Sequence, residues 1–210
     1  MPNGDATIGY FTVLESERMG WTGGLLVLNR GGRPIEFQCT LPVRPTKVHE
    51  ILYGATLRQH VIAEAIGPTL LKKVRTPLSL LICDQPESLR LDPPHDCILG
   101  LLVDAAEQDE GPMDADFLPG YHNIHLAGAE VAVPMERFDD ADELMQAFAD
   151  FPDGMEPLQR IRDAVKEAHS QLARSQPAAT TANSGGIAGK AGAPADAEGS
   201  IATGEIRRAA

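Results

Sequence analysis

Residues 21–41, WTGGLLVLNRGGRPIEFQCTL, decide the fold of this chain. An apolar run at 25–28 precedes the turn sequence NRGG at 29–32, and glycine supplies the positive φ that a tight turn needs. After the turn, apolar residues alternate with polar ones, so that Ile35, Phe37, Cys39 and Leu41 share one side. Two strands this close in sequence are expected to pair as an antiparallel hairpin, with Cys39 on the core face.

Outside this hairpin the apolar patterns predict further strands. Residues 8–14 indicate a first strand, and residues 129–133 a short last one. The runs at 78–83 and 98–103 are apolar without alternation, which favours strands covered on both faces. We expect any functional site to lie where these two strands meet the acidic loop that follows them.

Three helical pieces complete the pattern. The first spans about 48–71 and contains Gly67-Pro68, which predicts a kink or a break with proline at the first position of a second piece. Near the C-terminal side, Asp139 or Asp140 with Glu143 predicts a capping box at the start of a helix. An amphipathic stripe over 155–172 predicts the last helix.

Strands come mainly first and helices mainly last, an order that indicates an α+β fold. We expect an antiparallel or mixed sheet of about five strands, packed with a kinked helix and two C-terminal helices. One domain is predicted at 1–174. The Ala/Gly/Ser-rich tail at 175–210 is predicted to be disordered, because it has too few large apolar residues to offset its chain entropy.

Composition favours a cytoplasmic protein that does not enter a membrane. The chain has 210 residues and no apolar run of membrane-spanning length. Its first ten residues lack the basic and apolar regions of a secretory signal. Three cysteines at unrelated spacings argue against a disulfide framework.

The net charge of −12 is concentrated in one segment. Residues 1–103 carry ten acidic and ten basic side chains, whereas 104–163 carry sixteen acidic and three basic ones, a net of −13. Such a block repels phosphate backbones. Nucleic acid is therefore predicted to be an unlikely partner, and a protein partner or a homo-oligomer is favoured.

Cysteines and histidines in the middle of the chain raise the question of a metal site. Structural zinc sites show close CxxC or HxxxH pairs, and no such pair is present here. His122 and His125 are three residues apart, which would place them on opposite sides of a strand. The weak candidates for metal ligands are His95, Cys97, His122 and His125, with Cys83 and Asp96 nearby; the alternative is core cysteines and loop histidines.

No catalytic or cofactor-binding residue is assigned. No helix start or nucleophile-elbow motif flanks Cys39, Cys83 or Cys97. Neither glycine pair, 23–24 or 31–32, fits a phosphate-binding loop, so both pairs are interpreted as turn residues. The loop that begins at Asp104 also fails the calcium-loop template. Enzymatic activity is not favoured on these grounds.

The region at about 23–74, which includes GGLLVLNRGGRPIEFQCTLPVRPTKVHEILYGATL, resembles uncharacterised bacterial proteins of unassigned function. This resemblance implies a bacterial origin and carries no functional residue. The function predicted from the sequence is a non-enzymatic protein-interaction or scaffolding module. The alternatives are a metal-binding protein or metal-dependent hydrolase using the His/Cys/Asp cluster around 83–125, and a small-molecule sensor domain.

Overall fold

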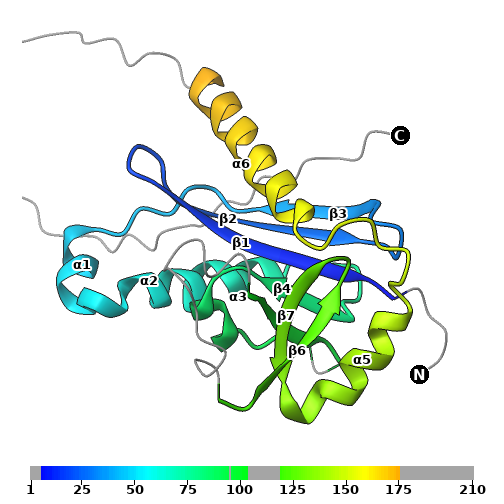
Figure 1. Ribbon diagram of the computed structural model, residues 1–210. Helices are drawn as coiled ribbons and strands as arrows, with labels where there is room; N and C mark the ends of the chain where they lie inside the picture. Colours follow the sequence, from blue (N-terminus) through cyan, green and yellow to red (C-terminus); the bar gives the residue numbers. More distant parts are fainter. Residues whose placement is uncertain (1–5, 95, 104–118, 176–210) are drawn as a thin grey trace, which may run out of the picture.

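Seven strands form one mixed sheet in the order β3-β2-β1-β4-β5-β7-β6 (Figure 1). The computed structural model describes residues 6–94, 96–103 and 119–175; His95, most of the predicted acidic loop and the predicted tail beyond Ser175 lie outside them. The first three strands are antiparallel, β1 is parallel to β4 and β4 to β5, and β7 pairs antiparallel with both β5 and β6. The strands are β1 (Ile8–Ser16), β2 (Gly20–Leu28), β3 (Pro34–Cys39), β4 (Leu80–Cys83), β5 (Ile98–Leu102), β6 (Tyr121–Leu126) and β7 (Ala129–Pro134).

Helices cover both faces of the sheet (Figure 1). The last helix, α6, packs with α5 on one face, and the π-helical segment η2 packs with α3 on the other. The helical elements are α1 (Lys47–Tyr53), η1 (Gly54–Thr56), α2 (Leu57–Gln59), η2 (His60–Ile66), α3 (Gly67–Leu71), η3 (Pro86–Arg90), η5 (Met135–Arg137), α5 (Phe138–Gln146) and α6 (Glu156–Ser175). Among the described residues, no helix combines the length and apolar character that crossing a membrane requires.

Gly23 and Gly24 lie inside β2, so the interpretation of this pair as turn residues was wrong. A Cβ at Gly23 would sit 2.2 Å from Cγ2 of Ile66 in η2, and a Cβ at Gly24 would sit 2.3 Å from Cγ2 of Ile161 in α6. Successive strand residues face opposite sides. The two glycines therefore let one helix approach each face of the same strand. The turn interpretation holds for the second pair, where Gly32 has a φ of +74°.

The broad fold prediction is confirmed as a mixed sheet with helices, but the expected number of about five strands was too low. The predicted hairpin is β2–β3, and the predicted break at Gly67-Pro68 separates η2 from α3. The strand missed by the sequence pattern is β6, whose HNIHL segment carries only two large apolar residues. The capping box is absent, because α5 begins at Phe138 and both aspartates lie in its first turn.

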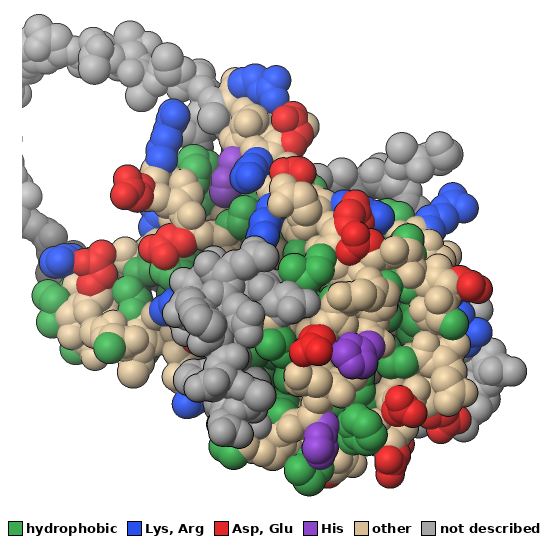
Figure 2. All heavy atoms as spheres, viewed as in Figure 1, with side chains coloured by type: hydrophobic (Ala, Val, Ile, Leu, Met, Phe, Trp, Pro, Cys, Tyr) green, Lys and Arg blue, Asp and Glu red, His purple; other side chains and the backbone are tan. Residues whose placement is uncertain are grey.

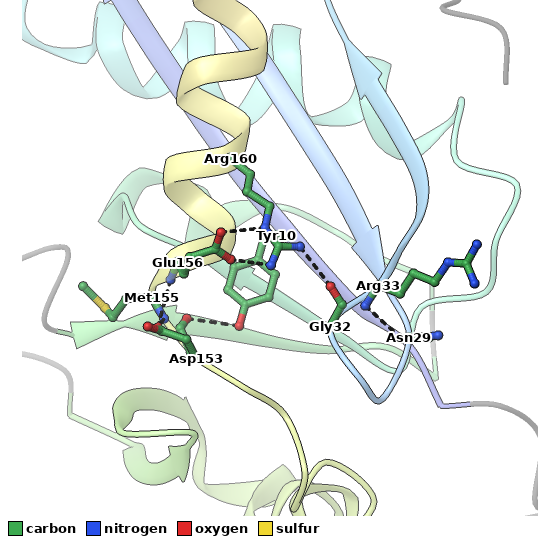
Figure 3. Close-up of polar contacts among 9 residues, drawn as sticks. Tyr10, Asn29, Gly32, Arg33, Asp153, Met155, Glu156 and Arg160 are labelled. Atoms are coloured by element: carbon green, nitrogen blue, oxygen red, sulfur yellow. Dashed lines mark hydrogen bonds and ion pairs between the residues drawn. The ribbon is translucent and has the colours of Figure 1, made fainter. Parts of the chain in front are cut away.

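The N-terminal end of α6 is held in place by a polar cluster (Figure 3). Asp153 accepts hydrogen bonds from the backbone N–H groups of Met155 and Glu156, which satisfies donors at the helix start. Arg160 pairs with Glu156 and donates to the backbone oxygen of Gly32 at 2.9 Å. These contacts fix α6 along the sheet and thereby fix the position of the next arginine along the helix, Arg162.

Candidate functional site

A buried carboxylate lies at the carboxyl end of the central parallel strands. Asp84 directly follows β4 and is 2% exposed. The parallel register pairs Phe11 with Cys83, so the next residue of β1, Thr12, lies beside Asp84. Ligands of open α/β sheets bind outside the carboxyl ends of parallel strands. The position of Asp84 therefore makes it the first residue to consider.

The two oxygens of the Asp84 carboxylate have different surroundings. Oδ2 accepts hydrogen bonds from the Thr12 hydroxyl at 2.7 Å and from Nη2 of Arg162 at 3.0 Å. Oδ1 is buried and has no hydrogen-bond partner. Burial raises the pKa of this carboxyl above its usual value, and the contacts with Thr12 and Arg162 oppose that shift. The site thus holds one satisfied and one unsatisfied oxygen.

Arg162 brings a positive charge to this carboxylate from α6, which packs on the sheet. About a third of its side chain is exposed, at 32%. A guanidinium has five N–H donors in a planar fork, which suits carboxylate and phosphate oxygens. The group is therefore oriented by a buried acceptor and also open to a ligand from solvent.

The backbone next to the site is held firmly. The Gln85 side chain accepts from the backbone N–H of Val13 at 3.1 Å and donates to the Val13 carbonyl at 2.8 Å. β4 ends at Cys83, and beyond it the Gln85 side chain continues the hydrogen bonding to β1. This clamp fixes the direction in which Asp84 points.

A second polar pair joins α6 to β2. The His169 ring nitrogen Nε2 lies 2.8 Å from the Thr22 hydroxyl, and burial lowers the pKa of the ring. His169 follows Arg162 by seven residues, which is two turns of the same helix face. The α6 face over this end of the sheet therefore carries two polar contacts.

The structure does not bring the predicted metal candidates together among the residues that it describes. Cys97 is buried on the η2 side of the sheet, and burial raises the pKa of its thiol to about 12. The His122 ring packs against Phe138, whereas His125, three residues along β6, falls on the other side of that strand. Within the described part of the chain, no group of three or more His, Cys, Asp or Glu side chains could hold a metal ion.

The residues that sequence reasoning missed are Asp84, Thr12 and Arg162. The available signal was an aspartate directly after an apolar strand, LLICD, at the edge where a site was expected. Nothing in the spacing connects residue 84 with residue 162. Only the packing of α6 across β2 and β1 does so.

Comparison with known proteins finds distant structural similarity only. No protein-family model and no curated protein matches the sequence. Human ENDOV is similar with a TM-score of 0.41 and 10% identity, over 81% of this chain and 87% of that chain. Endonuclease V from Ciona intestinalis, solved with a 23mer DNA containing an inosine followed by a ribo-adenosine, is similar with a TM-score of 0.37 and 10% identity, over 81% and 88%. Likeness at this level transfers neither an activity nor a residue.

The prediction of a non-enzymatic interaction or scaffolding module is contradicted. The solved structures with distant similarity to this chain include an endonuclease V. The prediction of this module also relied on an exposed apolar face of the sheet. In the structure β4 is fully buried, and helices cover both faces of the sheet. The apolar strands that suggested an open partner surface are instead the centre of the core.

The prediction that nucleic acid is an unlikely partner is contradicted by the same comparison, since one of these structures contains DNA. That prediction rested on the summed charge of 104–163, which does not describe any one surface. In the described part of the segment, acidic side chains gather around α5, whereas Lys and Arg are interspersed with Asp and Glu over α6 (Figure 2). Basic side chains therefore accompany the acidic ones on α6, the helix that carries Arg162.

Proposed function

We propose that the carboxyl edge of β1 and β4 binds a phosphate-bearing ligand together with a divalent cation, with hydrolysis of a phosphate ester as the activity. One observation carries the proposal: Oδ1 of Asp84 is buried without a hydrogen-bond partner, beside the partly exposed guanidinium of Arg162. Asp84 would hold the cation, and Arg162 would hold the phosphate.

A buried carboxylate oxygen without a partner is costly, at about 1–3 kcal/mol or more for a charged group. Such atoms are rare, and a bound water, an ion or a functional role accounts for many of them. An anionic oxygen accepts hydrogen bonds or binds cations, so its complement is a donor or a metal ion. The site therefore suits a positively charged or proton-donating partner for Oδ1.

One carboxylate from the protein is enough to bind a hard divalent cation when a phosphate of the ligand supplies further oxygen ligands. Mg²⁺ keeps several waters and is usually held by one or two carboxylates plus the phosphates of a substrate. Such a cation would neutralise charge on the phosphate and polarise a phosphoryl oxygen. The guanidinium of Arg162 would bind the phosphate through two parallel N–H groups.

The carboxylate is 2% exposed, so a cation reaches Oδ1 only if a neighbouring side chain moves, and the partly exposed Arg162, which contacts Oδ2, would be the one to move toward solvent. A phosphate at the exposed side of the guanidinium would favour that movement by offering a second anionic acceptor. Cation binding should therefore depend on the phosphate. A purely structural ion pair between Asp84 and Arg162 would show no such dependence.

Isothermal titration calorimetry with Mn²⁺, in the presence and absence of thymidine monophosphate, tests the proposal. The wild-type chain is expected to bind Mn²⁺ at least about tenfold more tightly with the nucleotide present, a difference of about 1.4 kcal/mol. Asp84→Asn should abolish this gain. The matched control is Asp163→Asn on the exposed side of α6, which should keep it. Equal Mn²⁺ binding by Asp84→Asn and the wild type would refute the proposal.

A hydrolysis assay completes the test. Bis(p-nitrophenyl) phosphate reports on ester cleavage without any requirement for a base or a sugar. The DNA in the Ciona structure suggests an oligonucleotide as a second substrate and adds no support to the proposal. Cleavage that requires Mn²⁺ or Mg²⁺ and is lost in Asp84→Asn is the expected result.

A further inference from the structure

A second arginine–carboxylate pair lies at the same edge of the sheet, on its other face. Arg58 of α2 donates to Oε1 of Glu87 at 2.7 Å, and its guanidinium carbon lies 5.8 Å from the ring centre of Trp21. The Arg58 side chain is 36% exposed and that of Glu87 is 18% exposed. Like Oδ1 of Asp84, Oε2 of Glu87 is buried without a hydrogen-bond partner. The second pair thus repeats the arrangement of the first.

The two pairs are close because their carboxylates belong to one short segment. Glu87 follows Asp84 by three residues, so their Cα atoms are at most about 11 Å apart. Arg162 reaches this segment from α6 and Arg58 reaches it from α2, on opposite faces of the sheet. One guanidinium from each face therefore meets solvent at the carboxyl edge of β4.

The Arg58 guanidinium is preorganised. It is held between the Glu87 carboxylate and the Trp21 ring. Restricting an arginine in this way lowers the conformational entropy that it would otherwise lose when it binds an anion. A planar fork that is already oriented favours a tetrahedral oxyanion such as phosphate.

We propose that Arg58 forms a second phosphate site, so that the ligand carries at least two phosphate groups and spans the edge from Arg162 to Arg58. This inference rests on the proposed function, since Arg162 supplies the first phosphate site. Two kinds of molecule present this chemistry: a small bisphosphate and a single-stranded oligonucleotide. The experiment below separates them.

The test compares three probes by fluorescence competition: thymidine monophosphate, thymidine 3′,5′-bisphosphate and a ten-residue oligothymidylate. The wild-type chain is expected to bind the bisphosphate at least about tenfold more tightly than the monophosphate. This ratio corresponds to about 1.4 kcal/mol of additional binding free energy. Arg58→Gln should remove that gain and leave the monophosphate affinity unchanged. Arg58→Lys, which keeps the charge but loses the fork, should retain part of it.

Arg33→Gln is the matched control, because it removes the same charge at the opposite edge of the sheet, where β3 begins. It should bind all three probes like the wild type. For the oligonucleotide, Arg58→Gln should also lower the slope of log affinity against log salt concentration by about 0.7, the loss of one phosphate contact on a single strand. Thermal melting of each variant shows that it is folded at the assay temperature.

The outcomes separate this inference from the proposed function. Monophosphate binding that depends on Arg162, with no gain for the bisphosphate and no effect of Arg58→Gln, would overturn the second site and leave the first intact. Monophosphate binding that Arg162→Gln does not weaken would overturn the proposed function itself. A gain for the bisphosphate that Arg58→Gln removes supports the inference. Tighter binding of the oligonucleotide than of the bisphosphate then identifies the polymer as the ligand.

Discussion

Replacing Gly24 by alanine should move α6 away from the sheet and thereby separate Arg162 from Asp84. The new Cβ would lie 2.3 Å from Cγ2 of Ile161, whereas ordinary van der Waals contact begins at 3.4 Å. The helix must therefore retreat by roughly the 1.1 Å between these two values. Because Arg162 follows Ile161 directly, a displacement of this size breaks the 3.0 Å contact with Asp84.

The magnitude follows from the packing on both faces of β2. The strand cannot retreat from α6, because Gly23 already lies against Ile66 of η2 on the other side. Overpacking a core typically costs about 1–3 kcal/mol. With the strand fixed and one charged hydrogen bond lost, Gly24→Ala should lower the free energy of unfolding by about 3 kcal/mol.

Urea denaturation followed by far-UV circular dichroism measures this loss. Gly31→Ala is the matched control, since its nearest neighbour would be Oδ1 of Asn29 at 3.7 Å and its φ is not in the left-handed range. It should change stability by less than about 0.5 kcal/mol. Adding Ile161→Ala to Gly24→Ala should cost less than the sum of the two single changes. The reasoning is refuted if Gly24→Ala loses less than about 1 kcal/mol, below the usual overpacking range, with an unchanged m-value.

Three further predictions concern charged contacts. Arg162→Ala should cost about 2 kcal/mol in urea denaturation, less than a fully buried pair because the arginine is a third exposed, and Asp84→Asn in the same chain should recover part of it. Burial alone would raise the pKa of Glu36, but hydrogen bonds from Gln38, Thr76 and the backbone of Arg75 outweigh burial and lower it. Stability from Glu36 is thus present above its usual pKa and lost as the pH falls through the lowered value, so Glu36→Gln should cost about 1 kcal/mol at neutral pH and progressively less as the pH falls through that lowered pKa. Burial lowers the pKa of His169, so its contribution to stability should fall as the pH drops below about 6.5, and His169→Gln should remove that part of the dependence of melting temperature on pH.

Local patterns predicted much of the fold because they depend on neighbouring residues. The alternation in 35–41 and the NRGG turn identify the β2–β3 hairpin, and Gly67-Pro68 identifies the break before α3. A pair of adjacent glycines does not by itself indicate one kind of structure. At 31–32 they form a turn, and at 23–24 they admit a helix on each face of a strand. Only the packing of η2 and α6 separates these two uses.

The candidate site could be located only roughly from the sequence. The edge where strand 78–83 ends was expected to carry function, and Asp84 lies there. Its partners are 72 and 78 residues away in the chain, however, so no local spacing reports them. Conversely, the described Cys and His residues that suggested a metal site do not share one face: Cys83 and Cys97 lie on the η2 side of the sheet, whereas the His122 ring packs against Phe138 on the α6 side.

The most direct test of the account is the position of a bound cation. Crystals of the full chain grown with Mn²⁺ and thymidine monophosphate would be measured at the manganese absorption edge. The account predicts an anomalous peak about 2 Å from Oδ1 of Asp84, with the phosphate on the guanidinium of Arg162. A nucleotide bound elsewhere, or Arg162 still on Asp84 with no peak at Oδ1 at saturating Mn²⁺, would contradict the account.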